Sequence, residues 1–316
     1  MFLRNCSTNT LRGVCKQLRS YATFEQGDFC MLRQLKTNKK MFVGPLEEAG
    51  ERGLRGGKIT HADIIGKKPR SVINTQDDTH DLQDSYKYMV HFPTLEEYVT
   101  HVPRACTPIY PKDAATIVQL LDLEPGHRVL EAGTGNGSLT LYMARAIFDG
   151  TDGTSQLDTF DIREAHSNTA KKHIERYARG KYSKIVQCHI GAVADQLPML
   201  TEPNEQYDAI ALDMPEPNDQ IPRLLPYLKN DRFIVCYLPN MTQVLSLAEQ
   251  IIELPLVMEA CIEAEWKEWE VRATHIRSRL VDGDGKPDAW VCRPKNFDVK
   301  GHTAFLVKLR KSGAIL

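Results

Sequence analysis

Three glycines, each one residue apart, follow a short apolar run and constrain the fold more than any other feature. The run Arg128–Leu130 is typical of a β-strand, and the glycines stand at 133, 135 and 137. Apolar side chains at 139, 143, 144 and 147 then repeat with the spacing of one helix face. A strand, a glycine loop and a helix in this order predict the start of a nucleotide-binding α/β sheet, since glycines let backbone N–H groups approach a ligand closely.

The spacing of this loop and a nearby acid favour one kind of ligand. The glycines read G-x-G-x-G rather than the dinucleotide pattern G-x-G-x-x-G, and Glu131 stands two residues before the first of them. A carboxylate there would repel a pyrophosphate but attract a cation. The stretch resembles the first motif of class I S-adenosylmethionine-dependent methyltransferases, and the resemblance implies that cofactor. A nicotinamide dehydrogenase is the alternative, for which the spacing is wrong.

Strand-like and helix-like segments alternate after the loop, as a doubly wound α/β sheet requires. We expect helices at 165–177 and 241–254, and further strands in 256–310 around a polar insertion at 282–286. Strands are expected at 156–160, 184–188, 207–212 and 232–238. The sequence therefore predicts a Rossmann-like domain.

The region before the glycine loop has a different pattern. Short apolar runs separated by Gly and Pro predict a small, barrel-like β domain over 23–93. Helices are expected over 95–107 and 113–121, with Asp113 as the N-cap of the second. The predicted domains are thus 23–93 and a methyltransferase-like domain over 94–316.

Residues 1–22 contain four arginines or lysines, several Ser and Thr, and no acid. This composition predicts a mitochondrial transit peptide, and a disordered basic tail is the alternative. The predicted location is the mitochondrial matrix, with the nucleus as the alternative.

Composition bounds the remaining possibilities. No apolar run approaches the ~18 residues of a membrane span, so no membrane association is expected. The eight cysteines form no C-x-x-C pair, and no metal site is predicted. Residues 31–70 carry ten Lys and Arg against four Asp and Glu, which suits either an RNA contact or a solvated face.

Candidate site residues stand where the expected strands end, because ligands of open α/β sheets bind beyond the carboxyl ends of the strands. Asp161 is placed to accept hydrogen bonds from ribose hydroxyls. Asp213 is followed by Pro215 and Pro217, which predict a rigid turn that fixes its carboxylate. A fixed carboxylate suits a ring nitrogen that gains positive charge on methylation.

Residues 24–310 resemble the tRNA (adenine-58, N1) methyltransferase family. The resemblance rests on stretches at 57–66, 93–98, 104–113, 212–217, 238–243, 268–269 and 301–306, together with the glycine loop. It implies a small N-terminal β domain before a class I methyltransferase domain. It also implies methyl transfer from S-adenosylmethionine to N1 of a T-loop adenine in tRNA.

The resemblance assigns roles residue by residue. It implies catalytic roles for Asp213 and Tyr110, and an S-adenosylmethionine site that also includes Asp213. The other cofactor-binding residues that it implies are Ile109, Glu131, Gly133, Thr134, Gly135, Asn136, Gly137, Ser138, Leu139, Asp161, His166 and Ala192. Ala192 departs from the family, which usually has Asp there to hold the cofactor's adenine. The departure implies either weaker cofactor binding or a neighbouring substitute such as Asp195.

The family also implies an assembly: a homo-tetramer, or a complex with a non-catalytic paralogous subunit. Two readings of the function stay open beside N1 methylation. One is a non-catalytic subunit that binds S-adenosylmethionine and tRNA. The other is a class I enzyme on another substrate, such as protein isoaspartate.

Overall fold

The structure, a computed structural model, describes residues 22–76, 86–150, 153–201, 206–274, 289–295 and 301–313. They fall into two compact units. The first comprises the described residues up to 108 together with 169–184, and the second comprises those of 109–168 and 185–316. The predicted transit segment, apart from its last residue, and the predicted polar insertion lie outside the described residues.

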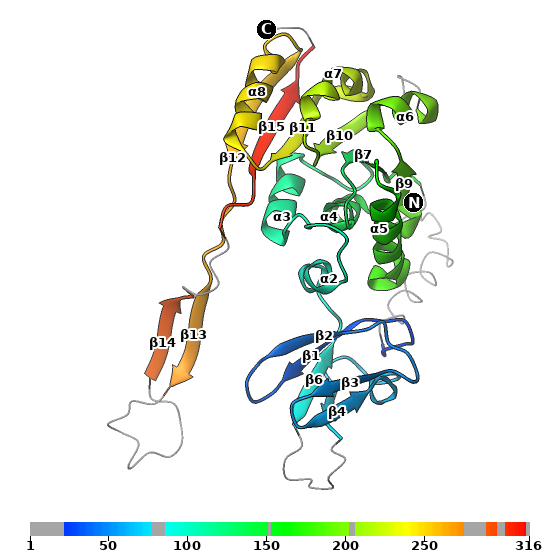
Figure 1. The fold of residues 1–316 in the computed structure, drawn as a ribbon, viewed down its shortest axis with the longest axis vertical. Helices are drawn as coiled ribbons and strands as arrows, with labels where there is room; N and C mark the ends of the chain where they lie inside the picture. The colour runs from blue at the N-terminus through cyan, green and yellow to red at the C-terminus, as the bar shows by residue number, and fades with distance from the viewer. Residues whose placement is uncertain are drawn as a thin grey trace, which may run out of the picture. The chain divides into compact units, whose positions relative to one another are not determined.

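The second unit contains a seven-stranded sheet with the order β12-β15-β11-β10-β7-β8-β9 (Figure 1). Its strands are β7 (Arg128–Ala132), β8 (Gln156–Asp161), β9 (Val186–Ile190), β10 (Tyr207–Leu212), β11 (Leu228–Leu238), β12 (Leu256–Ile262) and β15 (Phe305–Lys311). The five from β9 to β11 pair in parallel, and β15 is antiparallel to both neighbours. Because the strand order runs outward on both sides of β7, the predicted doubly wound α/β sheet is confirmed.

Helices alternate with these strands along the chain. They are α3 (Pro111–Leu120), α4 (Ser138–Ile147), α5 (Glu164–Arg176), α6 (Val193–Leu200), α7 (Ile221–Leu224) and α8 (Met241–Ile251). The prediction that Asp113 caps α3 is wrong: Tyr110 is the N-cap and Pro111 is the first helical residue. Proline is favoured at that position because its missing N–H would have no partner there anyway.

A hairpin is inserted between β12 and β15. Its strands β13 (Trp269–Thr274) and β14 (Ala289–Pro294) pair antiparallel and form a sheet of their own. Exposed apolar side chains on it include Trp269, Val271 and Trp290. The hairpin therefore carries apolar surface that its own two strands do not cover.

The first unit is built on a four-stranded antiparallel sheet with the order β2-β1-β6-β5. Its strands are β1 (Cys30–Gln34), β2 (Lys40–Val43), β5 (Val72–Asn74) and β6 (Lys87–His91), and β3 (Glu51–Leu54) pairs only with β4 (Gly57–Thr60) in a separate hairpin. The β domain is confirmed, but among the described strands the two sheets do not close into the expected barrel. Phe24, Leu32, Ile59 and Tyr88 contribute to its core.

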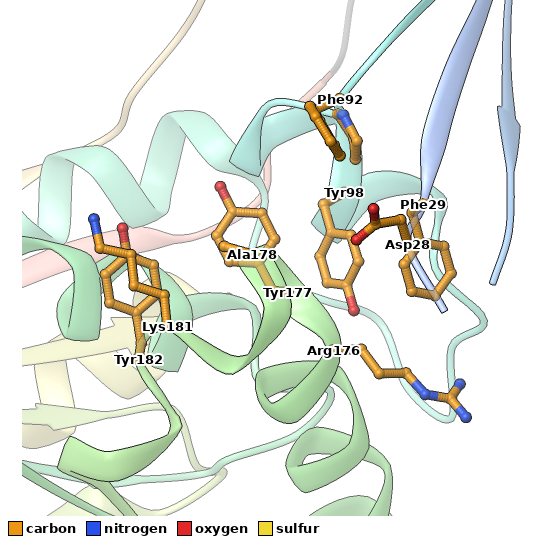
Figure 2. A pocket seen from close by; sticks show the side chains of 10 residues that line it. Asp28, Phe29, Phe92, Tyr98, Arg176, Tyr177, Ala178, Lys181 and Tyr182 are labelled. Carbon is orange, nitrogen blue, oxygen red and sulfur yellow. The ribbon is translucent and has the colours of Figure 1, made fainter. Parts of the chain in front are cut away.

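The end of α5 and the segment after it belong to the first unit. The Tyr98 hydroxyl donates a hydrogen bond to the His173 carbonyl at 3.0 Å, and its ring lies between those of Tyr177 and Phe29 (Figure 2). The ring centroids are 4.9 Å apart for Tyr98 and Tyr177 and 5.3 Å for Tyr98 and Phe29. A buried aromatic cluster thus joins residues far apart in the chain.

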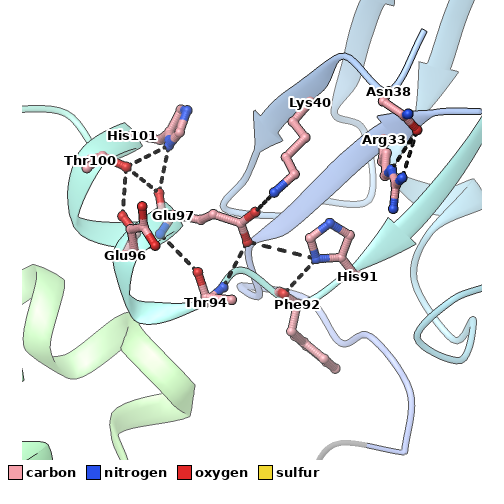
Figure 3. Close-up of polar contacts among 10 residues, drawn as sticks. All are labelled: Arg33, Asn38, Lys40, His91, Phe92, Thr94, Glu96, Glu97, Thr100 and His101. Carbon is pink, nitrogen blue, oxygen red and sulfur yellow. Dashed lines mark hydrogen bonds and ion pairs between the residues drawn. The ribbon is translucent and has the colours of Figure 1, made fainter. Parts of the chain in front are cut away.

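Helix α2 (Leu95–His101) begins with a capping box. Thr94 and Glu97 each accept a hydrogen bond from the other's backbone N–H at 3.1 Å. The Glu97 carboxylate also accepts from the Lys40 ammonium of β2 at 2.5 Å, which links this helix to the sheet (Figure 3). The prediction extended this helix to residue 107, but it ends at His101, two residues before Pro103.

Candidate active site

The parallel strands β7, β8, β9 and β10 end side by side, and the predicted site residues gather at this edge of the sheet. Asp213 follows β10, Asp161 ends β8, and Glu131 is the next-to-last residue of β7. The charges of Asp161 and Asp213 both raise the pKa of Glu131, and that of Asp161 raises the pKa of Asp213. The three carboxyl groups therefore form one electrostatic cluster.

The glycine loop has a backbone that other residues could not adopt. Gly133 has a φ of +101°, and a Cβ atom there would lie 1.9 Å from the Asp213 carbonyl oxygen. The loop thus packs directly on the turn that carries Asp213. Gly137 is the N-cap of α4 with a φ of 77°, so this helix begins in the left-handed region.

Asp161 holds the loop in place. Its Oδ2 accepts a hydrogen bond from the Gly135 N–H at 2.9 Å, and its Oδ1 accepts from the Arg163 N–H at 2.8 Å. His166 Nδ1 lies 3.5 Å from Asp161 Oδ2, so these two predicted cofactor residues are neighbours. A carboxylate has about four lone-pair directions, which leaves acceptor capacity for ribose hydroxyls.

Glu131 is completely buried beneath the loop. Its Oε2 accepts hydrogen bonds from the Thr140 hydroxyl at 2.5 Å and the Thr159 hydroxyl at 2.7 Å. Its Oε1 is buried and has no hydrogen-bond partner among the described residues. Burial, more than the neighbouring acids, raises the pKa of Glu131 to about 8.

Asp213 is mostly buried, but part of its surface is exposed. Burial first, and the charge of Asp161 second, raise its pKa to about 7. Its backbone N–H donates to the Ala132 carbonyl at 2.8 Å, which anchors the turn on β7. The Gln243 amide donates to the Pro215 carbonyl at 2.9 Å and secures the other side of the turn.

The turn before α3 is tied to the glycine loop. The Ser138 hydroxyl, in the first turn of α4, donates to the Ile109 carbonyl at 2.8 Å. Ile109 is buried, and Tyr110 is partly exposed. The other predicted loop residues Thr134, Asn136 and Leu139 are buried, and the hydroxyls of Thr134 and Thr159 are 2.7 Å apart.

Tyr237, near the end of β11, is a site residue that the sequence reasoning missed. Burial raises its pKa most, and the nearby charges of Asp113 and Asp213 raise it further. Tyr110 also interacts electrostatically with it and raises its pKa. The rule that flagged the ends of the first four strands, applied to the fifth, would have found it.

Ala192 is the N-cap of α6 and offers no side-chain hydrogen bond there. The Gly191 N–H donates to the Asp161 carbonyl at 2.9 Å, which keeps this segment at the sheet edge. The suggestion that Asp195 replaces the missing acid finds no support. Its carboxylate is 64% exposed and pairs with Arg223 at 2.7 Å.

The described residues contain no group of three or more His, Cys, Asp and Glu side chains arranged to hold a metal ion. Within the same ranges, none of the helices combines the length and apolar character of a membrane span.

Comparison with known proteins agrees with the geometry of the site. Residues 85–284 match the family model described as the tRNA methyltransferase complex GCD14 subunit. The tRNA (adenine(58)-N(1))-methyltransferase TrmI of Thermus thermophilus is 38% identical over 256 residues, which cover 81% of this chain and 86% of that protein.

Two crystal structures share the fold. A SAM-dependent O-methyltransferase from Thermotoga maritima superposes with a TM-score of 0.74 at 20% identity, covering 93% of this chain and 96% of the other. The tRNA (m1A58) methyltransferase TrmI from Aquifex aeolicus gives a TM-score of 0.69 at 24% identity, covering 92% and 100%. Both likenesses support a class I methyltransferase fold.

Proposed function

The chain belongs to the family of the tRNA methyltransferase complex GCD14 subunit, and we propose that it methylates N1 of the T-loop adenine, position 58, of tRNA. The observation that carries this proposal is the Asp213 carboxylate. Asp213 directly follows the central parallel strand β10 and packs against the glycine loop through its backbone, and its pKa is raised to about 7. A base or charge stabiliser poised near neutral pH is what this reaction needs.

The residues at the strand ends fit S-adenosylmethionine. The left-handed glycines leave the loop backbone bare of side chains, and buried Glu131 Oε1 lacks a partner among the described residues. An unpaired acidic oxygen beneath a glycine loop suits a ligand that carries positive charge. Asp161 and His166 supply polar atoms for ribose hydroxyls. When bound, the cofactor supplies an electrophilic methyl group on a sulfonium.

Asp213, Tyr110 and Tyr237 act on the acceptor base. Adenine N1 gains positive charge as it takes the methyl group, and an ionised Asp213 stabilises that charge in surroundings of low polarity. The same carboxylate can accept a hydrogen bond from the adenine amino group. The tyrosine rings supply flat apolar surface against which an unstacked base can lie.

Methyl transfer to a tRNA transcript tests the proposal. Unmodified tRNA should accept tritium from methyl-labelled S-adenosylmethionine, whereas a transcript with guanine in place of adenine 58 should not. An equal signal from both transcripts would rule out this target base. Transfer to an isoaspartyl peptide, in the absence of RNA, would instead support the class I protein methyltransferase reading.

A non-catalytic tRNA-binding subunit is the second candidate, and Asp213 argues against it. A subunit without chemistry has no need for a partly buried carboxylate whose ionisation lowers stability. Undiminished methyl transfer by an Asp213→Ala variant in a complex with a second subunit would revive that reading.

We propose further that the chain forms a homo-tetramer and acts in the mitochondrial matrix. The acid-free N-terminal composition supports the location, and the exposed apolar side chains of the β13–β14 hairpin offer surface for association. Fractionation of cells that express a tagged chain tests the location, and a nuclear signal would contradict it.

A further inference from the structure

A pocket of about 250 Å³ lies within the first unit, apart from every residue discussed above as part of the active site. One wall consists of Phe29, Phe92 and Tyr98, and the other of the segment Arg176–Tyr182 (Figure 2). Both walls belong to the same compact unit. The methylation reaction proposed above uses none of these side chains.

Aromatic rings dominate the lining. The Tyr177 centroid lies 4.9 Å from that of Tyr98 and 6.1 Å from that of Tyr182, whose plane is inclined to it by only 17°. Tyr98 and Tyr182 are buried, one in each wall, while Tyr177 is partly exposed. A partly exposed ring beside other aromatic rings is the arrangement on which bases stack in proteins that bind single-stranded nucleic acid.

Positive charge surrounds the rings. The segment 170–184 carries six Lys and Arg residues and one acid, Glu175. Arg176 and Lys181 line the pocket and are exposed. Asp28, the acid in the lining, is already neutralised, because the Arg179 guanidinium binds both of its oxygens at 2.9 and 2.6 Å. The exposed cations Arg176 and Lys181 therefore favour an anion such as a phosphate group at the pocket.

The backbone of the pocket wall is strained at two residues, and the side chain of one of them fixes it in place. Ala178 and Arg179 both adopt left-handed conformations, with φ values of 51° and 55°, which are unfavourable for residues other than glycine. The Arg179 side chain fixes them by donating to Asp28, to Glu25 at 2.8 Å and to the Thr23 carbonyl at 2.8 Å. Strain that is held by this many contacts is common at binding sites, where it pre-organises the pocket.

We propose that this pocket binds one unstacked nucleotide of the RNA substrate, other than the nucleotide that is methylated. The base lies against Tyr177, and the adjoining phosphates contact Arg176 and Lys181. This inference deepens the proposed function and rests on it. A pocket with aromatic rings for stacking and two nearby cations, Arg176 and Lys181, matches a nucleotide better than an acidic peptide. An acidic peptide offers negative charge without a flat ring.

Fluorescence anisotropy with a labelled, unmodified tRNA transcript tests the pocket. Tyr177→Ala should weaken binding about tenfold without changing the salt dependence, because it removes a stack and no charge. Tyr177→Phe, which keeps the ring, should bind like the wild type. Arg176→Ala/Lys181→Ala should weaken binding and reduce the slope of log affinity against log salt by about 1.5, as expected for two lost phosphate contacts.

Arg52→Ala/Lys87→Ala is the matched control. It removes two exposed cations from strands β3 and β6 of the same unit, away from the pocket lining. It should lower the affinity less than the pocket pair does. Unchanged binding of S-adenosylmethionine and a cooperative melt in each variant would show that the protein remains folded.

Two results would overturn the inference. One is unaltered tRNA affinity in Tyr177→Ala, which would leave the pocket a packing feature. The other is an equal loss in the control pair and the pocket pair, which would reduce the effect to overall charge. Because this assay measures binding and not transfer, a wild type that binds tRNA but methylates nothing would refute the proposed function alone.

Discussion

Three acidic side chains lie at the carboxyl ends of neighbouring strands, and the protein surrounds each of them differently. Asp161 accepts hydrogen bonds from two backbone N–H groups. Asp213 and Glu131 have raised pKa values of about 7 and about 8, chiefly because they are buried. A bound cation would therefore stabilise the charged forms of Asp213 and Glu131 in particular.

Asp213→Asn should lower kcat by about 10²- to 10³-fold, by analogy with the loss of one preorganised charge-stabilising group. The wild type should show kcat/KM for S-adenosylmethionine falling as the pH drops below about 7, because the free enzyme then protonates Asp213. Steady-state kinetics across pH 5.5–8.5 measure both effects. A profile without a break between pH 6 and 8 would remove Asp213 from this role.

The same substitution should raise stability. The folded-state pKa of Asp213, about 7, lies above its ordinary value of 3.8, so the folded protein keeps this proton longer than the unfolded chain. The associated stability is present below pH 4 and is lost as the pH rises to about 7. In denaturant melts, the free energy of unfolding of Asp213→Asn should therefore exceed that of the wild type by on the order of a few kcal/mol at pH 8. At pH 4 the difference should be small.

Elements with a strong local pattern were predicted well. The strand before the glycine loop and the helix after it lie where the apolar periodicity placed them. The sequence reasoning missed α6, because Pro198 within it reads as a helix breaker. It placed the third strand at 184–188, but 183–185 forms a 3₁₀ turn and the strand is Val186–Ile190. Short turns leave no periodicity to detect.

The site was predicted less completely than the fold. Sequence position alone singled out Asp161 and Asp213, since both lie at the carboxyl ends of parallel strands. The effect of the Asp161 charge on Asp213, the buried state of Glu131 and the ion pair of Asp195 with Arg223 depend on tertiary packing. The pocket at Tyr177 could not be predicted either, because its two walls are more than 70 residues apart in the chain.

The left-handed turn after α5 gives a prediction at the scale of one element. Ala178→Gly should stabilise the protein by about 1 kcal/mol, because glycine adopts a positive φ without the steric penalty that alanine has there. Thermal melting measures the change. A lower melting temperature would mean that the Ala178 methyl group contributes more by packing than its backbone loses.

The two segments that connect the β13–β14 hairpin to strands β12 and β15 give a second prediction at this scale. Buried Lys112 Nζ donates to Asp113 Oδ1 at 2.9 Å, to the Ala264 carbonyl at 2.7 Å and to the Thr303 hydroxyl at 2.6 Å. Ala264 follows β12 and Thr303 precedes β15, so one ammonium group holds both connections of the hairpin.

Lys112→Met should therefore destabilise the protein by about 3–5 kcal/mol, because it leaves the Asp113 carboxylate buried and unpaired. Lys112→Met/Asp113→Asn should lose less stability than Lys112→Met, because no buried charge is then left unpaired. Urea melts of both variants measure this. A change below about 0.5 kcal/mol in Lys112→Met would contradict the assigned role.

At the scale of the whole molecule, the two compact units do not follow the predicted domain boundary. The sequence suggested a change of domain at residue 93, whereas residues 94–108 and 169–184 pack with the first unit. Segment 169–184 begins inside helix α5, which starts in the second unit, and no composition change marks the transition. The aromatic cluster around Tyr98 and the hydrogen bonds of Arg179 to Asp28 and Glu25 connect this segment to the rest of the first unit.

Assembly belongs to this scale as well. If the chain forms a homo-tetramer, size-exclusion chromatography with light scattering should give about four times the mass of one 35.8 kDa chain. Replacing the exposed Trp269 and Trp290 of the hairpin by serine should then shift the mass towards smaller species. A wild type that elutes as a stable monomer would contradict the proposed assembly.

If the site around Asp213 places a methyl group on adenine N1, the reaction product will show it. Chromatography and mass spectrometry can map the methylated nucleoside in an unmodified tRNA transcript after incubation with the enzyme. We expect 1-methyladenosine at position 58 with the wild type and a yield at least about a hundredfold lower with Asp213→Asn. A methyl group on any other atom or nucleotide, or equal yields from the two proteins, would contradict it.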